Sequence, residues 1–134
     1  MLSHVTLGTN DLERATRFYD ALLVPLGLVR RAPEQEDGLP DGAGWHIRGT
    51  RTPVFYAHET FDRQPAAPGN GTMVAFLAPD RAAVDAAYVA AMEAGGTNEG
   101  APGDRPHYGE GYYGAYLRDP DGNKVHVVHR GDIA

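Results

Sequence analysis

Apolar side chains recur with helical spacing near the N-terminus of the chain. The stripe contains Leu12, Ala15, Tyr19, Leu22, Leu23 and Leu26. These intervals fit the helical period of about 3.6 residues and predict an amphipathic helix whose apolar face lies in the core. Asn10 is the expected N-cap, with Glu13 at the capping-box position, and Pro25 and Gly27 are expected to end the helix.

A second helix is expected after Asp80 and ends at Gly95 and Gly96; its apolar face contains Val84, Ala87, Tyr88 and Ala91. Elsewhere apolar and polar positions alternate, which predicts strands, because successive side chains of a strand point to opposite faces of a sheet. The expected strands are residues 3–8, 28–31, 44–48, 53–58, 72–77, 112–118 and 124–129.

The pattern of the first half returns in the second half. Aligning His4 with Met73 shifts the chain by 69 positions, and the same shift pairs Asp11 with Asp80, Tyr19 with Tyr88 and Gly27 with Gly96. Internal repetition of this kind indicates two structural units of one kind. We therefore expect a single α+β domain over residues 1–134, with two βαβββ modules at about 1–68 and 69–134. The alternative is a ferredoxin-type α+β sandwich, which accounts less well for the strands after each helix.

Composition narrows the classes of function. A formal net charge of −6 argues against a nucleic-acid or anionic-membrane partner. With no cysteine, the chain has no disulfide, no thiolate metal site and no cysteine nucleophile. Neither a phosphate-binding glycine motif nor a serine nucleophile elbow is present in the sequence.

The apolar segments are short. None approaches the roughly 18–20 residues that span a bilayer. Residues 3–7 already belong to a predicted strand, and they lack the basic region and the long apolar stretch of a signal peptide. We therefore expect a cytoplasmic protein with no membrane partner.

Three segments carry a family resemblance. DLERATRFY at 11–19, GGTNEGAPG at 95–103 and DPDGNKVH at 119–126 resemble the opening helix, the second-half connection and the last hairpin of the glyoxalase, bleomycin-resistance and extradiol-dioxygenase (vicinal oxygen chelate) superfamily. The resemblance implies paired βαβββ modules whose eight strands form an open, cup-shaped sheet around a cavity for a small molecule. We also expect a homodimer, because edge strands and helix faces often pair in this architecture.

The resemblance also implies where a divalent metal ion would bind, since the family's ligands come from the first, fourth, fifth and eighth strands. The first-strand position is His4, the fifth is Met73 and the eighth is His126, all expected on the inner face of the cup. Two neutral imidazoles and a soft thioether are a weak set for zinc, iron, nickel or manganese. We therefore expect a degenerate site, in which His4 and His126 hold at most one divalent metal ion.

The fourth-strand position falls near Phe55, or at Tyr56 or His58 if the register is shifted. Phe55, Met73 and Tyr113 are expected to contact the ligand. Two functions stay open. In the first, His4 and His126 are catalytic, as metal ligands or general acid and base, in a lyase, isomerase or dioxygenase of the glyoxalase type. In the second, the protein binds an antibiotic or metabolite without metal, as the bleomycin-resistance branch does.

Overall fold

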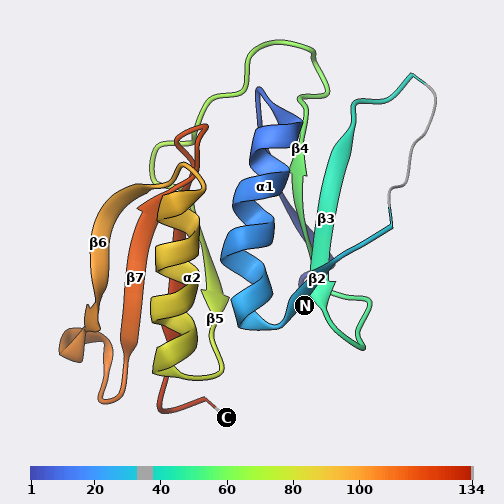
Figure 1. Cartoon of the computed structure of the whole chain (residues 1–134). Helices are drawn as coiled ribbons and strands as arrows, with labels where there is room; N and C mark the ends of the chain where they lie inside the picture. Colours follow the sequence, from blue (N-terminus) through green and yellow to red (C-terminus); the bar gives the residue numbers. More distant parts are fainter. Residues whose placement is uncertain (33–37, 134) are drawn as a thin grey trace.

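The computed structural model describes residues 1–32 and 38–133, and in these residues the order βαβββ occurs twice (Figure 1). The first module contains β1 (His4–Gly8), α1 (Leu12–Leu23), a short 3-10 helix η1 (Val24–Leu26), β2 (Leu28–Arg30), β3 (Gly42–Ile47) and β4 (Val54–His58). The second contains β5 (Met73–Leu77), α2 (Arg81–Glu93), β6 (Thr97–Asp104), the 3-10 helix η2 (Pro106–Tyr108), β7 (Tyr113–Arg118) and β8 (Lys124–His129). The expected α+β fold with two modules is confirmed.

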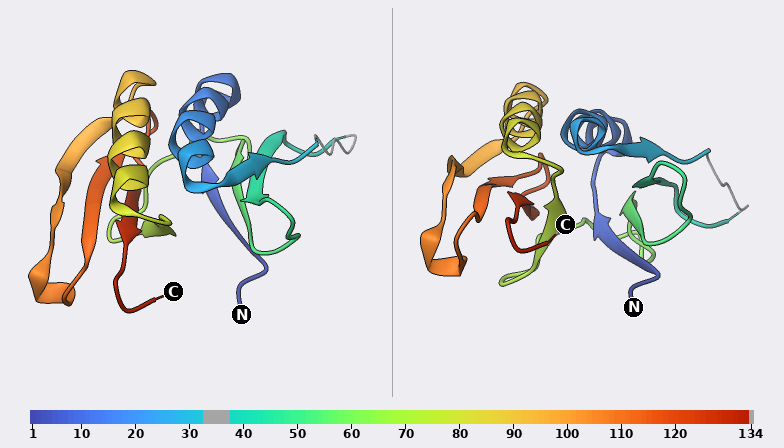
Figure 2. Two further views of the ribbon diagram at one scale, coloured as in Figure 1. Left: turned by 60° about the horizontal axis from the view of Figure 1, so that its bottom comes forward. Right: turned by 90° about the horizontal axis from the view of Figure 1, so that it is seen from below.

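The eight strands form two mixed four-stranded sheets with the same internal order. The first sheet has the order β1-β4-β3-β2 and the second β5-β8-β7-β6. In each, the first strand of the module runs parallel to the last, and the other neighbours are antiparallel. The two helices lie side by side, each against its own sheet (Figure 2). Within the described residues no backbone ladder joins the sheets.

The first helix begins one residue later than the capping pattern predicted. Asp11 is the N-cap, and its side chain accepts a hydrogen bond from the backbone N–H of Arg14 at 3.0 Å. The side chain of Asn10 instead pairs with both backbone groups of Ala66. Gly27 follows η1 with φ of +91°, a conformation that glycine adopts without strain.

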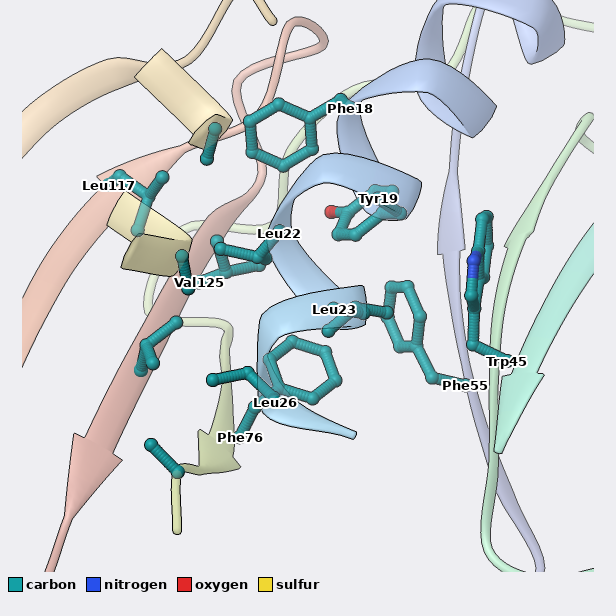
Figure 3. Packing of buried hydrophobic residues seen from close by; sticks show 14 of the residues in the cluster. Phe18, Tyr19, Leu22, Leu23, Leu26, Trp45, Phe55, Phe76, Leu117 and Val125 are labelled. Carbon is teal, nitrogen blue, oxygen red and sulfur yellow. The ribbon is translucent and has the colours of Figure 1, made fainter. Parts of the chain in front are cut away.

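One hydrophobic core spans both modules. Tyr19, Leu22 and Leu23 of the predicted stripe are fully buried, as is Phe18 on the same helix (Figure 3). The rings of Phe55 on β4 and Phe76 on β5 meet edge to face at 5.1 Å. The modules are therefore held together by packed apolar side chains as well as by the chain connection.

The turn at residues 119–123, between β7 and β8, binds the second module to the first. The buried Tyr19 hydroxyl donates to Asp119 Oδ2 at 2.6 Å, and Arg14 pairs with Asp121 at 3.0 Å. The amide of Asn123 donates to the carbonyl of Gly8 at 3.0 Å. These contacts fix the relative position of α1, β1 and the last hairpin.

The strand β6 was missing from the sequence-based assignment. It contains Gly100, Pro102 and Gly103, and its pairing with β7 shifts register near Gly100. Such residues are depleted from regular strands, so the alternation is hidden there. Among the residues that the structure describes, no helix has both the length and the apolar character needed to cross a membrane.

Candidate functional site

The face of each sheet that points away from the helices carries the polar side chains. On the first sheet, this face presents His4 and Thr6 from β1 and Tyr56 and His58 from β4. These residues share a face because they are two positions apart along each strand. Their neighbours Val5, Leu7, Phe55 and Ala57 turn toward the helices and belong to the core or pack against it.

A cavity of about 740 Å³ lies at this face. We call it the first-sheet cavity; the residues that line it include His4, Thr6, Arg31, Tyr56, His58 and Phe61. Pockets for small organic ligands usually have volumes of about 300–1,000 Å³. The first-sheet cavity is therefore large enough for such a molecule.

Two glycines of β3 allow the aromatic rings to lie flat in this cavity. A Cβ atom at Gly44 would lie 2.8 Å from Cε1 of Tyr56, and one at Gly42 would collide with the ring of His58. The His58 ring also stacks on Phe61, with centroids 5.0 Å apart and planes 12° apart. Its Nδ1 donates to the carbonyl of Glu59 at 2.7 Å. Both rings are therefore held in place before any ligand binds.

The Tyr56 ring connects the groups of the first-sheet cavity. It meets the exposed His4 ring edge to face at 5.8 Å, and its hydroxyl accepts a hydrogen bond from Arg31 at 3.1 Å. His4 Nδ1 lies 3.0 Å from the hydroxyl of Ser3. His4 and Tyr56 thus place an imidazole and a phenol together at the wall of the cavity.

A second cavity, of about 450 Å³, lies against the second sheet. We call it the second-sheet cavity; its lining includes Met73, Glu99, Arg105, Tyr108, Tyr116 and Lys124. Tyr116 forms part of its wall and stacks on His126, with centroids 4.0 Å apart and planes 7° apart. Burial raises the pKa of Tyr116, so its phenol is neutral at ordinary pH.

His126 is buried behind Tyr116, and both of its ring nitrogens have partners. Nδ1 donates to the carbonyl of Ala115 at 2.8 Å, and in the neutral ring Nε2 accepts from the Tyr112 hydroxyl at 2.9 Å. Burial is the main cause that lowers the pKa of His126, and Arg105 and Lys124 lower it further. A Cβ at Gly114 would lie 2.6 Å from Cε1 of His126, so glycine leaves the space for the ring.

The donors present do not fit a divalent metal ion. His4 lies on the first sheet, whereas Met73 and His126 lie on the second, and His4 and Met73 line different cavities. The part of the chain that the structure describes therefore does not place these three side chains on one common inner face. A metal ligand needs a free lone pair, and the hydrogen bonds of His126 use both nitrogens. Across residues 1–32 and 38–133, no group of three histidine, aspartate or glutamate side chains is arranged to hold a metal.

Two expected ligand contacts lie on the opposite faces of their strands. Phe55 packs in the core against Tyr19 at 4.7 Å and lines neither cavity; its neighbour Tyr56 takes the cavity position. Tyr113 lies toward α2, where its hydroxyl donates to Asp85 at 2.6 Å and Arg81 covers its ring at 4.9 Å. Side chains alternate regularly along both strands. The cavity position on β4 is therefore Tyr56, one residue after Phe55. On β7 it is Tyr116, three residues after Tyr113.

The sequence interpretation left open which tyrosines of the strand at 112–118 line the cavity, and it did not single out Lys124. Tyr116 lies between the buried residues Ala115 and Leu117 on β7, so alternation alone places it on the cavity face. Lys124 was treated only as part of a hairpin motif. Its position opposite Met73 follows from the parallel pairing of β5 with β8.

The comparisons with known proteins agree with this fold. The model of the Glyoxalase/Bleomycin resistance protein/Dioxygenase superfamily matches residues 1–127. A glyoxalase/bleomycin resistance protein from Albidiferax ferrireducens is 37% identical, with a TM-score of 0.79 over 97% of this chain and 98% of that chain. No curated protein matches the chain.

Two more distant structures share the architecture. A mutant of glyoxalase I from Zea mays is 25% identical with a TM-score of 0.70; the match covers 96% of this chain and 46% of the maize chain. A glyoxalase-related enzyme from Fulvimarina pelagi is 22% identical with a TM-score of 0.68, over 96% of this chain and 87% of that chain. From the family model and the 37% identical structure, the chain belongs to the glyoxalase/bleomycin resistance protein/dioxygenase superfamily.

Proposed function

We propose that the protein binds a small organic molecule in the first-sheet cavity without a metal ion. The observation that carries this proposal is the cavity of about 740 Å³ with rings already held in place, beside a donor set that does not fit a metal. Membership of a superfamily that includes bleomycin resistance proteins supports a binding role.

The lining of the cavity indicates the kind of molecule. The rings of Tyr56, His58 and Phe61 offer apolar surface for a flat ligand. The hydroxyls of Thr6 and Tyr56 and the imidazole of His4 offer hydrogen bonds to polar atoms of that ligand. A flat aromatic or heteroaromatic compound with a few oxygen or nitrogen atoms therefore fits this cavity best.

The test is calorimetric titration of EDTA-treated protein with a panel of small aromatic antibiotics and metabolites that includes metal-free bleomycin. We expect a member of the panel to bind in EDTA and to lose about tenfold or more in affinity in Tyr56→Ala, because the central ring of the cavity is removed. Tyr88→Ala is the matched control, since Tyr88 lies on α2 and outside the lining of the first-sheet cavity. Binding that requires added nickel or zinc, or that survives Tyr56→Ala, contradicts the proposal.

Turnover of the bound molecule is a second candidate function. It is favoured by the contact between the exposed His4 ring and Tyr56, which places a general acid or base at the cavity wall. His126 lies on the second sheet and both of its nitrogens have hydrogen-bond partners, so it takes no part in this scheme. Mass spectrometry of each ligand of the panel after incubation tests the idea: product that forms with the native protein and not with His4→Gln supports catalysis.

We also propose that the protein forms a homodimer. In the described residues β1 and β5 each pair with one strand, so each has a free edge. Met73 and Leu77 on β5 are exposed apolar side chains beside that edge. Free edges and exposed apolar groups favour association between copies. Light scattering after size exclusion should give twice the chain mass; a monomer at micromolar concentration contradicts this expectation.

A further inference from the structure

The linker at residues 59–72, which joins β4 to β5, ends in a tight turn (Figure 1). The backbone N–H of Thr72 donates to the carbonyl of Gly69 at 3.1 Å, so Asn70 and Gly71 are the two central residues. Gly71 has φ of +87°, which glycine adopts without strain. All four residues are exposed. The turn therefore presents an asparagine–glycine step to water, between the two modules.

The reactive groups of this step have no other engagement. An asparagine loses its side-chain ammonia when the backbone nitrogen of the next residue attacks its side-chain carbonyl carbon. Among the described residues, neither the amide of Asn70 nor the backbone N–H of Gly71 has a hydrogen-bond partner. Around a Cβ built at Gly71, the described residues other than its chain neighbours leave 4 Å of open space. Both groups are therefore free to reach the geometry of attack.

The other three asparagines of the chain are held in place. Asn10 pairs with both backbone groups of Ala66. The side chain of Asn98 accepts two hydrogen bonds, and the amide of the buried Asn123 donates to two acceptors. Each of the three is followed by a residue with a charged side chain, which hinders attack by the backbone nitrogen.

The step Asp121-Gly122 shows the opposite arrangement of a similar sequence. An aspartate can close the same ring, and Gly122 also has a positive φ, of +91°. The Asp121 carboxylate, however, accepts three hydrogen bonds, and the N–H of Gly122 donates to the carbonyl of Asp119 at 2.9 Å. The fold thus occupies the reactive groups in one turn and leaves them free in the other.

We propose that Asn70 is a site of spontaneous deamidation in the folded protein. The backbone nitrogen of Gly71 loses its proton and attacks Cγ of Asn70. A C–N bond forms and closes a succinimide ring, and the side-chain nitrogen takes a proton from solvent and leaves as ammonia. Water then adds to either imide carbonyl and breaks its C–N bond, which gives aspartate or isoaspartate. No group is oxidised or reduced, and water is the only co-reactant.

The product alters the connection between the modules. Each event adds one negative charge, and isoaspartate also adds a methylene group to the main chain. Before the turn, Pro68 packs against the hairpin at 119–123, since a Cβ at Gly122 would lie 3.4 Å from its Cγ; after the turn, β5 begins at Met73. Asn70 lines neither the first-sheet nor the second-sheet cavity. The modification is therefore independent of the proposed function.

Tryptic peptides separate the four asparagines, and the peptide of residues 64–81 contains Asn70 alone among them. The folded protein is incubated in ¹⁸O-water at mildly alkaline pH, transferred to ordinary water and digested, so that only deamidation before digestion carries the heavy oxygen. We expect labelled aspartate and isoaspartate in this peptide, at a rate at least about tenfold above that of the peptides with Asn10, Asn98 and Asn123. Comparable or faster labelling of another asparagine overturns the proposal. Electron-transfer fragmentation separates the isomers, and aspartate without isoaspartate means direct hydrolysis and also overturns it.

Variants and an unfolded reference complete the test. Asn70→Gln should abolish the labelling of residues 64–81, because glutamine must close a larger ring that forms slowly. The matched control is Asn98→Gln, which should leave that labelling unchanged, and thermal melting verifies that both variants are folded. In the native sequence, the folded-state rate at Asn70 should lie within about tenfold of the rate in urea, because the turn is free. A lower folded-state rate shows that the fold protects this turn and overturns the proposal.

Discussion

The hydroxyl of Tyr19 offers a sharp test of how the two modules are joined. Tyr19 is fully buried, and its hydroxyl donates to the buried Asp119 at 2.6 Å. The change Tyr19→Phe removes this hydrogen bond and leaves the ring packing intact. A hydrogen bond to a charged acceptor contributes about 1.5–3 kcal/mol. Asp119 Oδ2 keeps the amide of Asn123 as a second donor, so we expect a loss in the lower half of this range.

That loss corresponds to a melting temperature lower by about 5–8 °C for a chain of this length. The matched control is Tyr88→Phe, the same change at the repeat-equivalent position of α2. The Tyr88 hydroxyl donates to the neutral side chain of Asn98 at 3.0 Å in an exposed setting, so its removal should lower stability by less than about 0.5 kcal/mol. Both values come from urea unfolding followed by circular dichroism and by tryptophan fluorescence.

The pH dependence provides an independent check. Burial raises the pKa of Tyr19 well above its usual range, and the charge of Asp119 raises it further. The folded state thus favours the neutral phenol, and its contribution is fully present below the pKa of an unfolded tyrosine, about 10. The gap in stability between the native protein and Tyr19→Phe should shrink as pH rises above that value. Equal losses in Tyr19→Phe and Tyr88→Phe would refute the idea that the buried contact with Asp119 joins the modules.

Three further predictions concern the core and the second sheet. Leu22→Ala should lower the free energy of unfolding by about 2–5 kcal/mol because Leu22 is fully buried, and an unchanged urea midpoint would contradict this. Gly114→Ala should cost about 1–3 kcal/mol, because the new Cβ would press on His126; a melting temperature equal to the native value would show that the ring moves freely. Because the pKa of His126 is lowered in the folded protein, the unfolded chain binds a proton on this residue at a higher pH than the folded protein does. The contribution of His126 to stability is therefore lost as pH falls below about 6.5. NMR titration should show that the His126 ring titrates below that value, and a His126 ring that titrates at or above it would refute the prediction.

The repeat and the first helix were predictable from sequence because they depend on local periodicity. The stripe from Leu12 to Leu26 and the alternation of residues 124–129 report directly which side chains face the core. The strand β6 was not predictable in this way, because Gly100 and Pro102 interrupt the alternation. The helix cap at Asp11 was missed by one position, since Asn10 and Asp11 are both good capping residues.

The candidate site was only partly predictable, because its state depends on contacts between distant residues. Alternation placed His4 and Met73 on cavity faces, and both line cavities. His4 and Met73 line different cavities because of the way the two sheets pack, and no local sequence pattern encodes that packing. The state of His126 depends on Tyr112 and on the absence of a side chain at Gly114. A family motif identifies the position of a residue but not the partners that occupy its polar atoms.

The turn at residues 119–123 has a consequence for how the chain folds during synthesis. Its Asp121 accepts from the Thr9 hydroxyl, a contact between residues 112 positions apart. The same carboxylate accepts from the backbone N–H of Asn10, beside the start of α1. Because the ribosome delivers residues 119–123 more than 100 positions after Thr9 and Asn10, the beginning of the first module lacks these partners until the turn has been synthesised. The N-terminal half should therefore stay sensitive to protease on stalled nascent chains that end before residue 119, and become protected once the turn has emerged.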